Sequence, residues 1–176
     1  MSDLQDPVTK DDHQTGSQDA QWELVEYGDY QCPYCGQANV VIERIQQQWP
    51  DAVRVVFRNF PLVEMHPQAL YAAMVAEYAG QQGQFWEAHH LLFQHQKSLG
   101  PELYVQILQK LGLPLESFKE AMQNKQYIER IQADIDSGVR SGVQGTPSFF
   151  LNGQRLQIQS SYDEIYEILQ EKLQAS

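Results

Sequence analysis

The chain has 176 residues, which is enough for one domain with a substantial core, and its 42% hydrophobic content is ordinary for a globular protein. A formal net charge of −11 argues against nucleic acid or anionic membranes as partners, because their phosphates would be repelled. No stretch approaches the roughly 20 apolar residues of a membrane span, and the N-terminus lacks the charged, then apolar pattern of a signal peptide. We therefore expect a cytoplasmic protein. The alternative, if a signal peptide has been removed ahead of Met1, is a periplasmic or other extracytoplasmic protein.

Residues 1–21 are polar and show no hydrophobic periodicity. They carry five aspartates against a single lysine, which favours solvation over packing. We predict a flexible, loosely attached N-terminal arm here, and a folded domain over residues 22–176.

The folded part begins with an apolar run from Trp22 to Tyr27, which predicts a buried strand. A helix should follow from Pro33, which suits a first helical turn, to about Trp49. The β-branched run Val53–Arg58 predicts a second strand, and the resulting βαβ unit should be parallel and right-handed. Four apolar residues of the helix fall at helical spacing and should face the core: Ala38, Val41, Ile42 and Ile45.

Residues from about 61 to 140 are predicted to form a block of helices. Glycine and proline separate the segments, and no fixed period recurs, so the block is an insertion and not a repeat array. Apolar residues at helical spacing mark the segments Ala69 to Ala76, Phe85 to Phe93, Leu103 to Leu111, Leu115 to Met122, and Ile128 to Val139.

The chain then returns to strand patterns at Ser148–Leu151 and Arg155–Ile158. Asn152-Gly153 between them is a strong signal for a two-residue hairpin turn. An amphipathic helix from about Tyr162 to Leu173 closes the chain. The predicted order is therefore βαβ, a helical block, and ββα.

Both cysteines of the chain lie in one short segment, Cys32-Pro33-Tyr34-Cys35, directly after the first strand. Cys32 should stand at the helix N-terminus, where unpaired N–H groups and the helix dipole stabilise a thiolate below its ordinary pKa of about 8.5. Cys35 lies one helical turn later on the same face and can close onto Cys32. This arrangement predicts thiol–disulfide exchange, with Cys32 attacking and Cys35 resolving the mixed disulfide.

Two other uses of the cysteine pair remain open. A structural zinc site needs about four ligands, so the pair would have to recruit two further side chains from His66, His89, His90 and His95. A purely structural disulfide would close a very short loop and constrain the unfolded chain little. We favour redox chemistry, expect no bound metal, and interpret His89 and His90 as packed or surface side chains.

The order of elements, with Cys-x-x-Cys opening the first helix, resembles the thioredoxin fold, and the helical block resembles its DsbA-like branch. Three further segments are similar to that branch: His66-Pro67, Gln84 to His89, and Gly142 to Phe150 with its Gly145-Thr146-Pro147 loop. The resemblance covers nearly the whole chain. It implies an α/β class, thioredoxin-like, with an inserted helical block over about residues 61–140.

The resemblance also implies roles for individual residues. Cys32 matches the nucleophile, Cys35 the resolving thiol, and Glu26 a buried acid that moves the Cys35 proton. Pro147 matches a cis-proline whose loop faces the cysteines, so that Thr146 can present its backbone to substrate. From its apolar neighbours alone, Glu26 reads as buried, with an exposed edge-strand carboxylate as the alternative.

Pro33 and Tyr34 complete the expected substrate-binding set with Thr146 and Pro147. The strong oxidants of this family carry Pro-His between the cysteines, and Tyr34 supplies no imidazolium charge to the thiolate. An apolar surface around Cys32, Tyr34 and Pro147 could contact unfolded polypeptide.

The sequence thus predicts a thiol–disulfide oxidoreductase that works on protein or small-molecule disulfides through Cys32 and Cys35. Alternatives are an exported disulfide-forming oxidant of the same family, a glutathione-dependent transferase or isomerase on this scaffold, and a non-catalytic peptide-binding module. Relatives of the transferase class carry serine at the nucleophile position, which counts against that alternative. We expect no cofactor beyond the redox-active disulfide; the alternative adds glutathione as a co-substrate. The expected partners are thiol- or disulfide-containing proteins or glutathione, and the expected state is a monomer.

Overall fold

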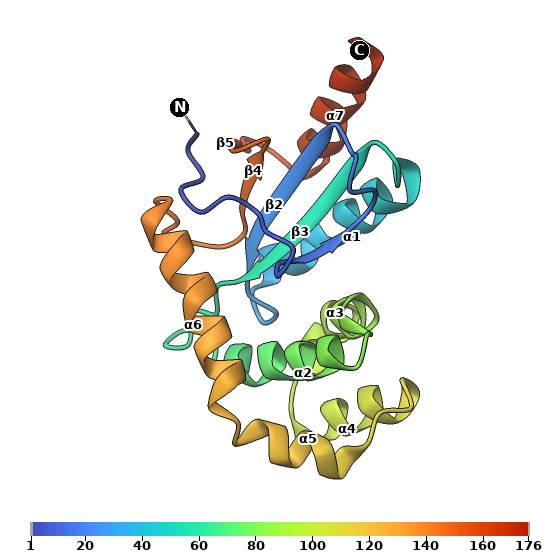
Figure 1. The fold of residues 1–176 in the computed structure, drawn as a ribbon, viewed down its shortest axis with the longest axis vertical. Coiled ribbons are helices and arrows are strands. Elements are labelled where there is room, and N and C mark those ends of the chain that lie inside the picture. Colours follow the sequence, from blue (N-terminus) through green and yellow to red (C-terminus); the bar gives the residue numbers. More distant parts are fainter. Residues whose placement is uncertain (1, 176) are drawn as a thin grey trace.

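A computed structural model describes residues 2–175 and contains one mixed five-stranded sheet in the order β1-β3-β2-β4-β5 (Figure 1). β2 and β3 are parallel, as predicted, and the remaining neighbours are antiparallel. The predicted thioredoxin-like α/β fold is confirmed. The strands are β1 (His13–Thr15), β2 (Trp22–Gly28), β3 (Val53–Asn59), β4 (Ser148–Leu151) and β5 (Gln154–Arg155).

One face of the sheet is covered by α1 (Pro33–Gln48) and α7 (Asp163–Ala175). Every second residue of the central strands points to this face, because side chains alternate along a strand. The core there contains all four residues that the helical spacing assigned to it. Its buried members are Leu24, Ala38, Val41, Ile42, Ile45, Val53, Val55, Phe149, Leu151, Ile165 and Leu169.

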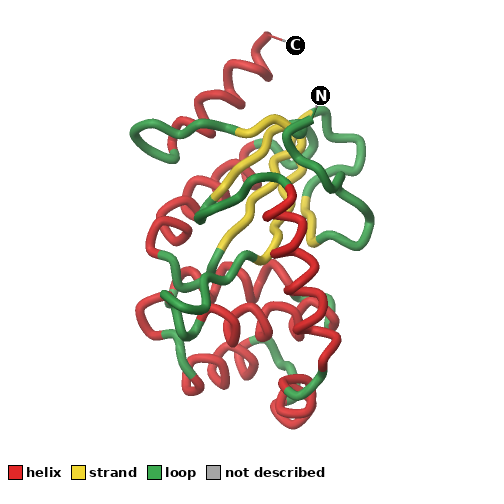
Figure 2. Tube along the Cα trace, turned by 90° about the vertical axis from the view of Figure 1, so that its left-hand side faces the viewer, coloured by secondary structure: helices red, strands yellow, loops and turns green. Residues whose placement is uncertain are grey.

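The helical insertion lies at one end of the sheet, and α6 runs back along the sheet toward β4 (Figures 1 and 2). Its helices follow the predicted segments closely. Among the described residues, none of the helices is long and apolar enough to cross a membrane. The elements are α2 (Ala69–Gln81), α3 (Phe85–Gln94), η1 (Gln96–Ser98), α4 (Pro101–Lys110), α5 (Leu115–Met122) and α6 (Lys125–Arg140).

The inner face of α6 is more polar than the sequence pattern suggests. Ile128 and Val139, two of the apolar residues that mark this helix, are exposed. Ser137 and Gly138 are buried in their place, because Ser137 hydrogen-bonds Tyr27 and a side chain at Gly138 would collide with Phe60. Hydrophobic spacing therefore located the helix but only part of its inward-facing side, which includes Ile131 and Ile135.

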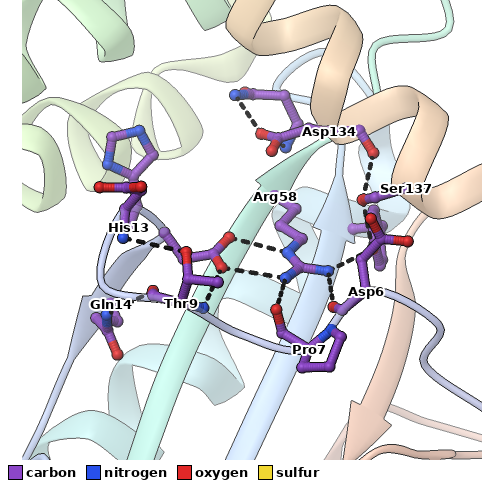
Figure 3. Close-up of polar contacts among 12 residues, drawn as sticks. Asp6, Pro7, Thr9, His13, Gln14, Arg58, Asp134 and Ser137 are labelled. Atoms are coloured by element: carbon purple, nitrogen blue, oxygen red, sulfur yellow. Dashed lines mark hydrogen bonds and ion pairs between the residues drawn. The ribbon is translucent and has the colours of Figure 1, made fainter.

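The N-terminal arm is attached to the sheet, in contrast to the predicted loose segment. β1 pairs with β3, and Leu4 is buried on the face opposite α1. The Arg58 guanidinium donates to both carboxylate oxygens of Asp12, at 2.9 and 3.1 Å, and to the carbonyl oxygen of Asp6 at 2.9 Å (Figure 3). The aspartates of the arm favoured a solvated segment in the sequence, because the sequence does not show that one of them contacts a buried arginine.

The C-terminal hairpin turns at the predicted residues. Asn152 and Gly153 both have positive φ, 47° and 82°, as a two-residue hairpin turn of this kind requires. The second strand is shorter than the predicted Arg155–Ile158, since β5 ends at Arg155. Residues 156–159 line a groove beside α1 instead.

Candidate active site

Cys32 occupies the N-cap position of α1, with Pro33 at the first helical position, as the sequence predicts. Its side chain is almost buried, with 4% of its surface exposed, and Cys35 is fully buried one turn later. Both are free cysteines in this structure. The arrangement presents one thiol at the surface of the site and places the second behind it.

The pKa of Cys32 is lowered to about 5. The largest cause is a hydrogen bond from the Cys35 side chain, which burial opposes. The Thr146 side chain and, to a smaller extent, the backbone N–H groups of Cys35 and Tyr34 also lower this pKa. A free cysteine has a pKa of about 8.5, so Cys32 is a thiolate at neutral pH. Cys35 behaves in the opposite way, because burial and the neighbouring Cys32 raise its pKa well above the ordinary value.

Glu26 lies beneath the cysteines in the central strand β2. It is paired in register with Phe57 of β3 and Phe149 of β4, and only 1% of its surface is exposed. Strand alternation puts it on the α1 face, like Leu24 two residues earlier. The buried interpretation is therefore correct, and the exposed edge-strand alternative is wrong.

The carboxyl group of Glu26 is incompletely satisfied. Its Oε2 has no hydrogen-bond partner among residues 2–175. Burial, with a further contribution from the charge of Cys32, raises its pKa to about 8. A Cβ at Gly28 would lie 2.9 Å from Glu26 Oε2 and 2.6 Å from Phe57 Cε1, so a glycine is needed there to make room for the acid. Glu26 is a mostly protonated carboxylic acid at neutral pH.

The loop from Gly145 to Ser148 closes the site from the other side. The Thr146–Pro147 peptide is cis, as predicted. Cys32 Sγ lies 3.6 Å from the carbonyl oxygen of Thr146, which places this loop directly against the nucleophile.

Two grooves flank the cysteine pair. Tyr34 and Pro147 line a groove of about 710 Å³ between α1 and residues 155–163. Pro33 lines a second one, of about 610 Å³, between α1 and the end of α3. Tyr34 is 60% exposed, so its ring is available to a bound molecule. Of the four predicted substrate-binding residues, only Thr146 lines neither groove, and it contacts Cys32 instead.

Asp29, which the sequence analysis did not single out, organises the turn before α1. Its Oδ1 accepts from the N–H groups of Gln31 (2.7 Å) and Cys32 (3.2 Å). Its Oδ2 accepts from the Leu62 N–H (2.9 Å) and lies 2.8 Å from Nδ1 of His66. An aspartate that caps its own turn is a recognisable local signal. The contacts with residues 62 and 66 have no counterpart in the sequence pattern.

The other residues of this turn are also held by the helical insertion. The Tyr30 hydroxyl lies 2.8 Å from Nδ1 of the fully buried His89, and Gln31 Oε1 accepts from the Gln68 N–H at 2.7 Å. His89 is thus a packed side chain, as expected. Among residues 2–175, no three or more His, Cys, Asp or Glu side chains are grouped so that they could hold a metal ion.

Three solved structures that resemble this chain share more than nine-tenths of its length. BdbD from Bacillus subtilis superposes with a TM-score of 0.80 at 25% identity, covering 93% of each chain. A periplasmic thioredoxin-like protein from Salmonella enterica serovar Typhimurium gives 0.78 at 27% identity, covering 94% of this chain and 91% of the other. Alpha-DsbA1 from Wolbachia pipientis gives 0.82 at 19% identity, over 97% and 95%, and supports the fold alone. The predicted thioredoxin-like architecture with its helical insertion is confirmed by these likenesses.

Sequence relatives extend beyond this domain. The Na⁺/H⁺ antiporter NhaA 1 of Salinispora arenicola is 43% identical over 154 residues, which is 87% of this chain but 24% of the antiporter. A similar protein from Herminiimonas arsenicoxydans is 37% identical over 91% of this chain and 25% of its own length. The chain therefore spans about a quarter of these relatives. A family model described as thioredoxin matches residues 8–171, and the chain belongs to the thioredoxin family.

Proposed function

We propose that this chain is a thiol–disulfide oxidoreductase that acts through Cys32 and Cys35. The observation that carries the proposal is the opposite shift of the two thiols. The pKa of Cys32 falls to about 5, and that of Cys35 rises well above its ordinary value. One cysteine is therefore a nucleophile at neutral pH, and the other stays protonated until it is needed.

In the reductive direction, the Cys32 thiolate attacks one sulfur of a substrate disulfide. A bond forms between Cys32 Sγ and that sulfur, the substrate S–S bond breaks, and the second substrate sulfur leaves as a thiolate. Cys35 then loses its proton and attacks Cys32 Sγ, which releases the first substrate sulfur. The substrate gains two electrons, and the Cys32–Cys35 pair becomes a disulfide; the oxidative direction reverses each step.

Glu26 is the acid or base of the resolving step. Part of the rise in its pKa comes from the negative charge of Cys32. That charge disappears when Cys32 enters a mixed disulfide, so the pKa of Glu26 falls and a larger fraction of it is ionised. The base that accepts the Cys35 proton thus becomes available at the stage when Cys35 must attack.

Substrates of this site are extended segments that carry a disulfide or a pair of thiols. The groove of about 710 Å³ beside Tyr34 and Pro147 has the size of a ligand site, and it adjoins the loop that touches Cys32. Glutathione is the small-molecule co-substrate that we would test first.

The low pKa of Cys32 favours oxidation of substrates. A stabilised thiolate stabilises the reduced pair, which makes the corresponding disulfide a stronger oxidant. The similarity to a periplasmic thioredoxin-like protein supports action outside the cytoplasm, and no comparison supports the cytoplasmic location expected from the sequence. A redox titration against glutathione should give a potential well above thioredoxin's approximate −270 mV. A value at or below that figure would contradict the oxidative direction.

The exchange chemistry itself is tested by labelling the reduced protein. A limiting amount of an alkylating reagent near neutral pH should modify Cys32 and leave Cys35 unmodified, because only Cys32 is a thiolate there. Cys35→Ser should trap substrates as stable mixed disulfides, and Cys32→Ser is the matched control that should trap none. Preferential labelling of Cys35, or equal trapping by both variants, would overturn the assignment.

A further inference from the structure

A single side-chain amide from the helical insertion binds the backbone of the active-site turn at two points. Gln96 lies in η1, and its Nε2 donates to the carbonyl oxygens of Tyr30 at 2.8 Å and Cys32 at 2.7 Å. The Cys32 carbonyl also accepts from the Gly36 N–H at 3.1 Å. Gln96 and the first turn of α1 therefore hold the same oxygen atom.

These two hydrogen bonds constrain the conformation around the nucleophile. The carbonyl of Cys32 belongs to the peptide plane shared with Pro33, so fixing it fixes ψ of Cys32, which is 120° here. The carbonyl of Tyr30 fixes the plane at the start of the turn in the same way. The Tyr34 and Cys35 N–H groups, which lie in the helical turn that follows this peptide plane, help to lower the pKa of Cys32.

The packing around Gly36 shows that the amide is closely fitted. A Cβ at this position would lie 2.4 Å from Oε1 of Gln96 and 3.1 Å from its Cδ, and the nearest heavy atoms all belong to that side chain. Gly36 lies inside α1, where glycine is unfavourable by about 0.5–1 kcal/mol relative to alanine. The helix thus carries an unfavourable residue at the place where Gln96 needs the space.

We propose that Gln96 is a positioning residue for Cys32: its amide holds the turn in the conformation that directs backbone N–H groups at the Cys32 sulfur. The inference rests on the proposed function, because it concerns the reactivity of the same thiol. It assigns the helical insertion a direct part in the chemistry, through one contact 64 residues along the chain from Cys32.

The first test replaces the amide by a side chain of similar length. Gln96→Met removes both donors, and Gln94→Met is the matched control, because Gln94 is exposed in the same segment. The thiolate of the reduced full chain is titrated by ultraviolet absorbance and by alkylation rate. We expect the Gln96→Met midpoint to rise by about one pH unit, with about fivefold slower alkylation near pH 5. Gln94→Met should match the unsubstituted protein.

The second test uses the contact between Gly36 and Gln96. Gly36→Ala should shift the midpoint in the same direction as Gln96→Met, because the added methyl group displaces the amide. In a Gln96→Ala background the same substitution should have no effect on the midpoint, since the space is then open. Alanine also favours the helix, so a loss of folding is not expected to obscure the result.

Three outcomes separate the possible roles. A raised midpoint in Gln96→Met, with coupling to Gly36→Ala, supports the positioning role even if no substrate is turned over, in which case the proposed function fails alone. A lowered melting temperature with an unchanged midpoint would make Gln96 a purely structural residue and overturn the inference. Equal effects of Gly36→Ala in both backgrounds would also overturn it.

Discussion

Two ionisable side chains are buried on opposite faces of the same sheet, and they differ in how many polar partners they have. Glu26 of β2 faces α1 and the cysteines, and one of its oxygens has no partner among residues 2–175. Arg58 of β3 faces the N-terminal arm, and only 4% of its surface is exposed. Its guanidinium donates to Asp12, Tyr27 and the backbone of the arm (Figure 3).

The difference separates a buried ionisable group that can react from one that stabilises the fold. Burying a charge costs several kcal/mol unless partners compensate it. At Arg58 they do, so the group stays charged and fastens the arm to the sheet. At Glu26 the cost is avoided by protonation, which leaves a carboxylic acid whose proton can move. A buried ionisable group with too few partners is therefore a better indicator of chemistry in this fold than a buried charge as such.

The largest expected effect tests the Glu26 side of the comparison. The pKa of Glu26 is raised to about 8 from the ordinary 4.5, so the folded protein binds a proton that the unfolded chain releases. The stabilisation is complete below pH 4.5 and is lost as the pH rises through 8, by about 5 kcal/mol in total. Glu26→Gln should abolish this loss. Urea denaturation of the reduced proteins at several pH values measures the difference between them.

A Cys32→Ser background serves as the control for that experiment. Without the thiolate charge the pKa of Glu26 should be lower, because that charge is the second cause of its shift. The loss of stability should therefore end at a lower pH. Parallel stability curves for Glu26→Gln and the unsubstituted protein between pH 4 and pH 9 would show that Glu26 is ionised in the fold.

The next largest effect on the free energy of unfolding concerns Arg58, whose buried charge is paired with Asp12. Arg58→Met should lower the free energy of unfolding by about 4 kcal/mol, because it leaves the largely buried Asp12 carboxylate without its cation. Arg54→Met on the same strand is the matched control. Its pair with Glu23 is about 20% exposed at each end, and such pairs contribute roughly 1 kcal/mol or less. Equal losses in urea denaturation would mean that burial does not distinguish the two pairs.

The sequence predicted the active-site residues, including Glu26, better than the contacts that Arg58 makes. Cys32, Cys35 and the order of elements lie in local patterns, and Glu26 stands out as an acid in an apolar strand. The attachment of the arm depends on Asp12 meeting Arg58, 46 residues away, and the support of the turn depends on Gln96. Such polar pairs leave no periodicity, because a hydrogen bond needs one donor and one acceptor and not a repeated face.

Asp134 does not follow the division between Glu26 and Arg58, and its expected effect on the free energy of unfolding is smaller. It lies on α6 against Asn59, the residue after Arg58, and burial raises its pKa to about 6 although the Asn59 N–H donates to it at 2.9 Å. Stability from its proton is complete below the ordinary pKa of 3.8 and is lost as the pH rises through 6, by about 3 kcal/mol. Asp134→Asn should remove this loss while keeping an acceptor for Asn59. Parallel stability curves for Asp134→Asn and the unsubstituted protein between pH 3.5 and pH 6.5 would contradict the assignment.

The smallest expected effect comes from the chain of hydrogen bonds that joins Arg58 to α6 through Tyr27 and Ser137. Arg58 Nη1 donates to the Tyr27 hydroxyl at 2.8 Å, which lies 2.7 Å from Ser137 Oγ, and Ser137 donates to the Asp134 carbonyl at 2.8 Å. Since the Ser137 proton is used on that carbonyl, Tyr27 donates to Ser137 and accepts from Arg58.

Tyr27→Phe removes both bonds but leaves Arg58 its carboxylate, so the loss in unfolding free energy should be about 1.5 kcal/mol, well below that of Arg58→Met. Ser137→Ala removes only the far bond and should cost less than Tyr27→Phe. The double variant should cost less than the sum, because the two residues share one bond. Strict additivity would show that the bond between Tyr27 and Ser137 contributes nothing to stability. A Tyr27→Phe loss as large as that of Arg58→Met would show that the Tyr27 hydroxyl and not the Asp12 carboxylate holds the arginine in place.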